Sequence, residues 1–65
     1  MPLVRIDMWA GQGPEVKQAL VRNVTKAVVD AVGCPVEAVE ILICEQDKAN
    51  WAQGGVTHAE RFPSR

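Results

Sequence analysis

Apolar and polar residues alternate in two separate segments of the chain, which is the pattern of strands with one covered face. In residues 3–9 the side chains of Val4, Ile6 and Met8 point to one side of the strand, and those of Arg5 and Asp7 point to the other. The second segment, Val39 to Glu45, alternates in the same way, but Leu42 and Cys44 make its other face apolar too. We therefore predict two strands, the second of which is partly covered on both faces.

A helical pattern separates the two predicted strands. Pro14 can open a helix, because the first helical position needs no backbone N–H. Gly33 suits the position after the last helical residue, and Pro35 prevents the helix from resuming. Apolar residues recur at helical spacing and form one broad face, with Lys17 among the residues that lie off it. These apolar residues are Val16, Leu20, Val24, Ala27, Val28 and Ala31.

Strand, helix and strand in this order form a β-α-β unit, in which the strands should be parallel and the crossover right-handed. The Gly54-Gly55 pair predicts a turn, and we expect residues 46–65 to form a short hairpin or arm that packs on a neighbour. There is no repeat or linker in the sequence. We predict a single domain over residues 1–65, of the α/β class (α+β in some schemes).

The predicted unit leaves much apolar surface uncovered. The chain has 65 residues, of which 48% are hydrophobic, and a domain of this size buries only about 60% of its unfolded surface. A two-stranded sheet under one helix also leaves two strand edges that can pair with another chain. We therefore predict an oligomer of identical chains.

Charge and residue spacing exclude several classes of function. The formal net charge is −1 with no basic run, which argues against nucleic-acid binding. No apolar stretch is long enough to span a membrane, and the N-terminus lacks a signal-peptide layout, so we expect no membrane partner. Cys34, Cys44 and His58 do not have metal-site spacing, and we expect both thiols to be reduced in the cytoplasm.

Several short motifs follow one another along the chain. Met1-Pro2 is followed at once by a strand, Gly11 lies in the turn after it, and residues 31–35 read Ala-Val-Gly-Cys-Pro. The second strand and the segment Asn50 to Gly55, which reads Asn-Trp-Ala-Gln-Gly-Gly, complete the set. In this order and spacing the chain resembles the 4-oxalocrotonate tautomerase family over nearly its whole length.

The resemblance implies a β-α-β protomer that assembles as a homohexamer, a trimer of dimers. It implies an isomerase that acts on a small-molecule substrate, an enol or keto form of a small acid, without a metal or other cofactor. It also implies that Pro2 is the catalytic residue once Met1 is removed. If Met1 stays attached, the nitrogen of Pro2 is acylated and cannot act as a base.

The chemistry of a terminal proline suits this role. A small second residue favours removal of the initiator methionine, after which Pro2 carries a free secondary amine. Such an amine can take a proton from the carbon next to a carbonyl and return it elsewhere, which is tautomerisation. It can also attack a carbonyl carbon to form an iminium ion. Position alone leaves open that Pro2 is an incidental residue after Met1.

Two positions depart from the family pattern. Well-known members hold a dicarboxylate with two arginines, and these positions are Gln12 and Glu40 here. Glutamine lacks the charge that holds a carboxylate, and Glu40 would repel a dianion. We therefore expect a substrate that is not a dicarboxylate. The loss of cations also raises the pKa of the Pro2 amine, which favours its use as an acid. As alternatives, Gln12 is a turn-surface residue and Glu40 a solvated strand residue.

The aromatic position of the family's pocket is kept as Trp51, where phenylalanine is usual. Trp51 would supply an apolar wall that excludes water, although a plain interface tryptophan fits the same position. Trp9 is bulkier than the usual aliphatic residue and could narrow the site. We expect His58 to be an exposed tail residue and Cys34 to be a packing residue.

Three functions are compatible with these residues. The first is a tautomerase that acts on a small enol or 2-keto acid, with Pro2 as acid or base. The second is a hydratase or dehalogenase-like lyase, in which Glu40 activates water. The third is a non-catalytic oligomer that has lost the substrate-binding arginines. A replacement cation could come from Arg5, Arg22 or Arg61, and nothing in the sequence selects one.

Overall fold

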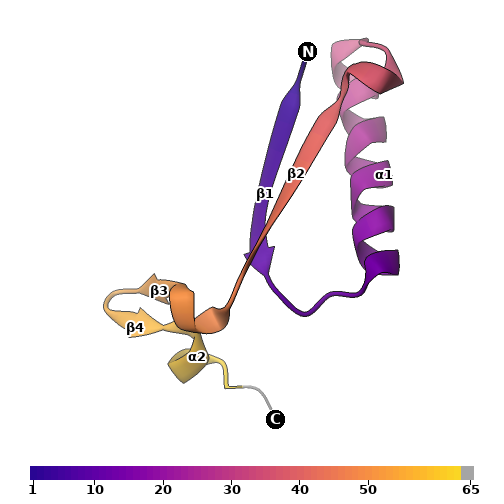
Figure 1. Ribbon diagram of the computed structural model, residues 1–65. Coiled ribbons are helices and arrows are strands. Elements are labelled where there is room, and N and C mark those ends of the chain that lie inside the picture. Colours follow the sequence, from indigo (N-terminus) through magenta and orange to yellow (C-terminus); the bar gives the residue numbers. More distant parts are fainter. Residues whose placement is uncertain (64–65) are drawn as a thin grey trace.

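The computed structural model describes residues 1–63, which form a long β-α-β unit followed by a smaller arm (Figure 1). Strand β1 (Leu3–Trp9) leads through a glycine-containing loop to helix α1 (Pro14–Val32). A short 3-10 turn, η1 (Val36–Ala38), then leads to strand β2 (Glu40–Gln46). The predicted β-α-β unit is confirmed.

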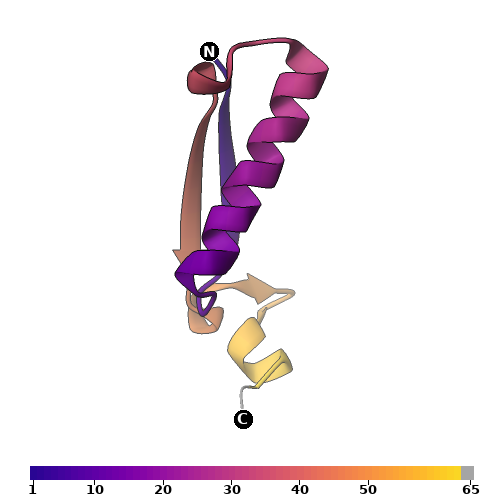
Figure 2. The ribbon, with the colours of Figure 1, turned by 90° about the vertical axis from the view of Figure 1, so that its right-hand side faces the viewer.

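The arm after β2 is built from short elements that lie beyond the end of the β1–β2 sheet, at the opposite end from the N-terminus (Figure 2). β3 (Ala52–Gln53) and β4 (Val56–Thr57) pair antiparallel, and the glycines of the turn between them have φ values of 62° and 83°. The short hairpin predicted from Gly54-Gly55 is therefore confirmed. Residues 64 and 65 of the predicted arm lie outside the described part of the chain. The elements are η2 (Lys48–Asn50), β3 (Ala52–Gln53), β4 (Val56–Thr57) and α2 (His58–Arg61).

The two long strands are parallel, as predicted, and pair in register from Leu3–Glu40 to Trp9–Gln46. β2 begins and ends one residue later than predicted. The reason is that Val39 caps the C-terminal end of η1, since its N–H donates to the carbonyl oxygen of Val36 (3.2 Å). The alternation of β2 is unchanged by this shift, because each residue keeps its face.

The ends of α1 lie where the sequence predicts. Pro14 is the first helical residue. Gly33 follows the last one with a φ of 79° and donates its N–H to the carbonyl oxygen of Val29 (2.9 Å). This left-handed conformation is one that residues with a Cβ adopt only at a cost.

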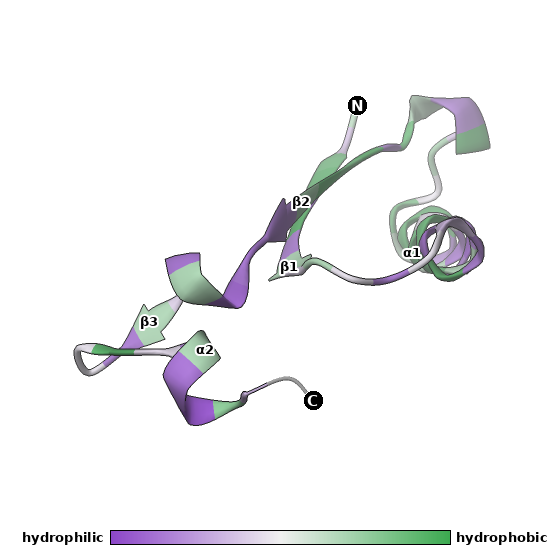
Figure 3. Cartoon of the chain, turned by 60° about the horizontal axis from the view of Figure 1, so that its bottom comes forward, coloured by the Kyte–Doolittle hydropathy of each residue, from purple (hydrophilic) through white to green (hydrophobic). Residues whose placement is uncertain are grey.

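One face of the β1–β2 sheet looks toward α1, whose hydrophobic side is turned to the strands (Figure 3). The ion pair between Lys17 of α1 and Glu45 of β2 (Nζ–Oε1 2.5 Å) joins the helix to this face. Lys17 was predicted to lie off the apolar face, and this prediction is wrong because its side chain reaches across to the sheet. The half-buried apolar residues of this face are Val4, Ile6, Met8, Ile41 and Ile43.

None of the described residues is buried within the single chain. Part of the predicted apolar face of α1 is uncovered, since Val16, Ala27 and Ala31 are exposed. On the second face of the sheet, which we call the open face, Leu3 is 64% and Leu42 51% exposed. One helix can cover only one side of a two-stranded sheet, so this apolar surface stays exposed in the single chain. Within residues 1–63 no helix is both long and apolar enough to cross a membrane.

Candidate active site

Pro2 and Glu40 lie side by side at the start of the parallel strands. The backbone N–H of Glu40 donates to the carbonyl oxygen of Pro2 (3.0 Å). Proline suits this position before a strand, because it lacks the N–H that a ladder position would use. Glu40 pairs with Leu3 and shares the open face with it, and Glu40 is exposed whereas Pro2 is half-buried. The structure therefore brings together the predicted acid or base and one predicted substrate-binding residue.

The other two predicted site residues lie at the far end of the sheet. Gln12 is exposed in the loop between β1 and α1, where Gly11 has a φ of 118°. Trp51 lies in the arm, between η2 and β3. The seven residues of β1 separate this end from Pro2 by roughly 23 Å, at about 3.3 Å per residue. A single chain therefore cannot gather all four predicted residues around one small substrate.

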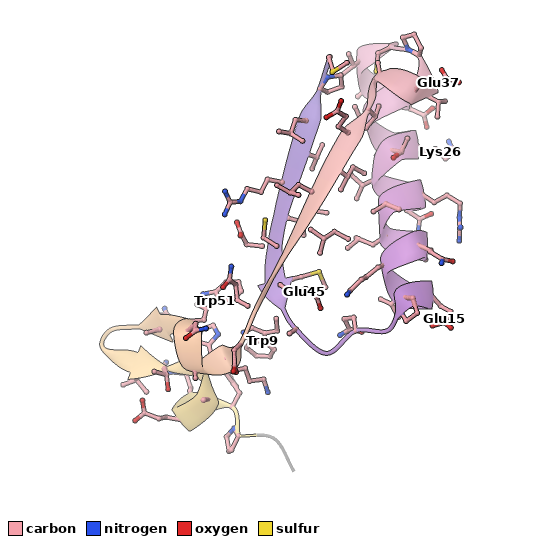
Figure 4. All side chains as sticks on the ribbon, viewed as in Figure 1. Trp9, Glu15, Lys26, Glu37, Glu45 and Trp51 are labelled. Carbon is pink, nitrogen blue, oxygen red and sulfur yellow. The ribbon has the colours of Figure 1, made fainter. Side chains whose placement is uncertain are left out.

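An aromatic cluster, made of Trp9, Trp51, His58 and Phe62, joins the arm to the end of β1. The rings of Trp51 and His58 are stacked, with centroids 5.3 Å apart and an interplanar angle of 13°. The indole Nε1–H of Trp9 donates to Nδ1 of His58 over 2.8 Å. Phe62 packs with centroid distances of 5.5 Å to both Trp9 and His58. Figure 4 places Trp9 and Trp51 at this junction.

His58 is half-buried in this cluster, so the prediction of an exposed tail residue is wrong. The reason is that its main partner, Trp9, lies 49 residues earlier in the chain. Only the folded arm brings the two side chains together. The one signal in the sequence is that both tryptophans and the single histidine flank the ends of predicted elements, which does not specify a contact.

Local hydrogen bonds hold the short α2 helix of the arm in place. Thr57 Oγ1 accepts a bond from the N–H of Glu60 (3.2 Å), and the Glu60 carboxylate accepts one from the N–H of Thr57 (3.0 Å). This is a capping box. The bond from the Thr57 backbone, followed by that from its hydroxyl, lowers the pKa of Glu60, because both bonds favour the ionised carboxylate.

Lys48 ties η2 to the same cluster. Its ammonium group donates to the carbonyl oxygen of Phe62 (3.0 Å) and lies 4.6 Å from the ring centroid of Trp9. A cation over an indole face is attracted by the negative charge of the ring's π-system. Asp47 supports the turn by accepting a bond from the N–H of Ala49 (3.3 Å). The arm is thus connected to β1 through the side chain of Trp9.

Of the three candidate replacement cations, Arg5 shares the open face with Glu40, two residues along β1 from Leu3. Arg5 donates to Asp7 (3.3 Å), and this bond and charge raise the pKa of the Arg5 guanidinium. The other two candidates lie elsewhere: Arg22 is exposed on α1, and Arg61 donates to the carbonyl oxygen of Gln53 (3.4 Å).

Pro2 lines neither of two surface hollows formed by residues 1–63. One of about 370 Å³ is formed by α1 and η1 and is lined by residues including Val21 and Val36. Another, of about 330 Å³, lies beside the arm and is lined by residues including Lys48 and Phe62. Among residues 1–63, no group of three His, Cys, Asp or Glu side chains is close enough to hold a metal ion.

A family model described as "Tautomerase enzyme" matches residues 2–61 of the chain. The chain belongs to the tautomerase family. The match covers the β-α-β unit and most of the arm, including the position of Pro2 and that of Trp51. The resemblance inferred from the short motifs is therefore confirmed.

Individual relatives agree with this assignment. This tautomerase is 40% identical over 60 residues to 2-hydroxymuconate tautomerase from Comamonas testosteroni, covering 92% of this chain and 95% of the relative. TomN, a 4-oxalocrotonate tautomerase homologue of the tomaymycin biosynthetic pathway, has a TM-score of 0.91 at 36% identity, over 97% of each chain. A heterohexamer 4-oxalocrotonate tautomerase from Chloroflexus aurantiacus has a TM-score of 0.87 at 35% identity, over 92% of this chain and 97% of that one. The α/β fold and an enzyme of the tautomerase type are therefore confirmed.

Proposed function

We propose that this tautomerase uses the amine of Pro2, freed by removal of Met1, as acid or base on a small enol or 2-keto acid that is not a dicarboxylate. The observation that carries the proposal is the 3.0 Å bond between the Glu40 N–H and the Pro2 carbonyl oxygen. This bond holds Pro2 at the end of a regular sheet, beside an acidic residue. A reactive group on a regular element is positioned more sharply than one on a loop.

The proposed chemistry needs only proton transfers. When an enol converts to its keto form, the enol oxygen loses one proton and the carbon next to the new carbonyl gains one. A single amine can serve both steps if it donates one proton and accepts the other. A protonated amine can supply the first proton, and an anionic residue on the neighbouring strand, Glu40, favours that charged form of Pro2.

The charges around Pro2 support the exclusion of dicarboxylates. A second carboxylate would need a cation, and Glu40 offers the opposite charge. Gln12 can donate a hydrogen bond from its amide but adds no charge. A substrate with one carboxylate, or with none, avoids this repulsion.

The pocket of the proposed enzyme is completed between copies of the chain. Trp51 stands roughly 23 Å from Pro2 along β1, so the Trp51 that walls a pocket belongs to a neighbouring chain. The absence of any buried residue among residues 1–63 supports an assembly, as does the heterohexamer of Chloroflexus aurantiacus. We propose a homohexamer built as a trimer of dimers. The two free cysteines are compatible with a reducing cytoplasm, which we propose as its compartment.

The test begins with an intact-mass measurement that verifies the removal of Met1. Ketonisation of phenylenolpyruvate is then followed for the wild type, for Pro2→Ala and for a control, Pro35→Ala, which leaves the terminal amine in place. Pro2→Ala should lower kcat/KM by about 10²–10⁴, the usual contribution of a general acid or base. Absence of turnover by the processed wild type, or full activity of processed Pro2→Ala, would overturn the proposal.

A second candidate function follows from the position of Glu40 next to Pro2. An exposed carboxylate beside a protonated amine can activate a water molecule while the amine supplies a proton, as in hydration or hydrolytic dehalogenation. The substrates to test are 3-haloacrylates and acetylenic acids. Unchanged turnover of these compounds by Glu40→Gln would exclude this role. Retention of Met1 in the cellular protein would instead favour a non-catalytic oligomer.

A further inference from the structure

We infer that His58 is a positioning residue, which holds the Trp51 wall of the pocket in place through a hydrogen bond to Trp9. The inference rests on the proposed function, in which Trp51 walls the pocket of a neighbouring chain. His58 takes no part in the proton transfer itself. Its role is to set the orientation of the Trp51 indole.

Trp51 is held by His58 at two points. The backbone N–H of His58 donates to the carbonyl oxygen of Trp51 over 2.6 Å. The two rings are stacked at 5.3 Å with only 13° between their planes. The backbone bond fixes the root of the Trp51 side chain, and the stack fixes the plane of its indole. A change in the orientation of the His58 ring is therefore transmitted to Trp51.

The orientation of His58 is in turn set by Trp9. The indole Nε1–H is a donor only, so Nδ1 of His58 must be the acceptor, and the proton of the neutral imidazole lies on Nε2. Trp9 is the last residue of β1, so the 2.8 Å hydrogen bond from its indole to His58 fixes the arm relative to the sheet. Lys48 and Phe62 pack on Trp9 and limit the movement of its indole.

This chain of contacts links the two ends of the proposed site. Pro2 directly precedes β1, the strand whose last residue is Trp9, and Trp9 holds the His58 ring that stacks on Trp51. In an assembly of identical chains, the β1–β2 sheet that carries the Pro2 amine then also sets the orientation of the Trp51 indole that the chain presents to its neighbour. Loss of the Trp9–His58 bond should displace the Trp51 indole and admit water to the pocket, while the substrate still binds. We therefore expect kcat to fall by a larger factor than KM rises.

Three substitutions separate the contributions of the Trp9 donor, the His58 acceptor and the His58 ring. Trp9→Phe keeps an aromatic ring and removes the donor. His58→Phe keeps a ring to stack on Trp51 and removes the acceptor. His58→Asn places an amide oxygen near the position of Nδ1 and so keeps the acceptor. Each is measured for kcat and KM with phenylenolpyruvate, beside Pro2→Ala, after sedimentation velocity has verified an unchanged assembly.

We expect kcat to fall about 10-fold in Trp9→Phe and in His58→Phe with less than a threefold change in KM. The double variant should lose no more than either single one, because both remove the same bond. His58→Asn keeps the acceptor but lacks the ring that stacks on Trp51, so its kcat should also fall, by up to about 10-fold. A wild-type kcat in this variant would show that the stack does not set the plane of the Trp51 indole. In the Trp9→Phe background Trp51 is the one remaining tryptophan, and its emission should shift to longer wavelength as water gains access.

The failures of the two proposals can be told apart. Wild-type kcat in both Trp9→Phe and His58→Phe, with Pro2→Ala inactive, would reject the positioning role and leave the proposed function standing. Full activity of processed Pro2→Ala would reject the proposed function. Additive losses in the double variant would show that the two residues act separately and would overturn the inference.

Discussion

Lys17 of α1 and Glu45 of β2 form an ion pair with an Nζ–Oε1 distance of 2.5 Å, and their side chains are 33% and 31% exposed. Within residues 1–63 it is the one ion pair that joins the helix to the sheet. The loop between β1 and α1 would otherwise leave the helix to be placed by apolar contacts alone, which are non-directional. The pair therefore adds a directional contact between the first turn of α1 and the end of β2.

A double-mutant cycle should give this pair a coupling free energy of about 0.5–1 kcal/mol, the upper part of the range for partly exposed pairs. Lys17→Met and Glu45→Gln keep most of the side-chain volume and remove the charges. The control is the pair Lys26–Asp30 within α1, which is 76% and 61% exposed and should couple by about 0.3 kcal/mol. Urea unfolding measures both cycles at one protein concentration. Equal coupling free energies in the two cycles would show that the Lys17–Glu45 pair contributes no more than an exposed pair within the helix.

Reversing the charge beside Pro2 should change substrate preference. Glu40→Arg replaces a repulsive group by one that binds a carboxylate bidentately. We expect kcat/KM for 2-hydroxymuconate to rise about 10- to 100-fold, which corresponds to about 1.4–2.8 kcal/mol. Glu40→Gln is the control that removes the repulsion without adding a cation, and it should give a smaller rise. If Glu40→Arg leaves the dicarboxylate rate unchanged, Glu40 does not face the substrate.

The capping box of α2 should make the arm sensitive to acid. The pKa of Glu60 is lowered below its ordinary value of 4.5, chiefly by the bond from the Thr57 N–H. Because the folded pKa is the lower one, the stabilisation is present above the unfolded pKa and is lost as pH falls through the folded pKa. A change in tryptophan emission as pH falls below the ordinary glutamate value of 4.5 should therefore report loosening of the arm.

Glu60→Gln is the matched control for this acid response. Its amide oxygen can still accept from the Thr57 N–H, but the side chain does not titrate. The arm should stay ordered at neutral pH, and the Glu60-dependent step in emission should disappear. Persistence of the same step in Glu60→Gln would assign it to another group.

The open face of the sheet should be needed for assembly. Leu42 is 51% exposed in the single chain, and covering a leucine side chain contributes about 1.5–3 kcal/mol. Leu42→Glu should shift the protein to smaller species in sedimentation velocity, whereas Leu42→Met, which stays apolar, should not. An unchanged distribution for Leu42→Glu would show that copies associate through other surfaces.

Local structure was predictable where neighbouring residues carry the information. Pro14 and Gly33 bound the helix because each suits one backbone position and few others. The start of β2 was misplaced by one residue, since the bond from Val39 to Val36 that extends η1 leaves no trace in the alternation. The position of Pro2 beside Glu40 follows from parallel pairing, which the helix between the strands requires.

The sequence by itself determined the order of the elements, the turn glycines, and the presence of a proline that could become a terminal amine. Periodicity and backbone preference are local properties, so they can be read from neighbouring residues. Only the tertiary structure decided that Lys17 reaches Glu45 and that His58 stands between Trp9 and Trp51. Such contacts join residues far apart in the chain and depend on how the arm turns after β2, for which the spacing of residues carries no signal.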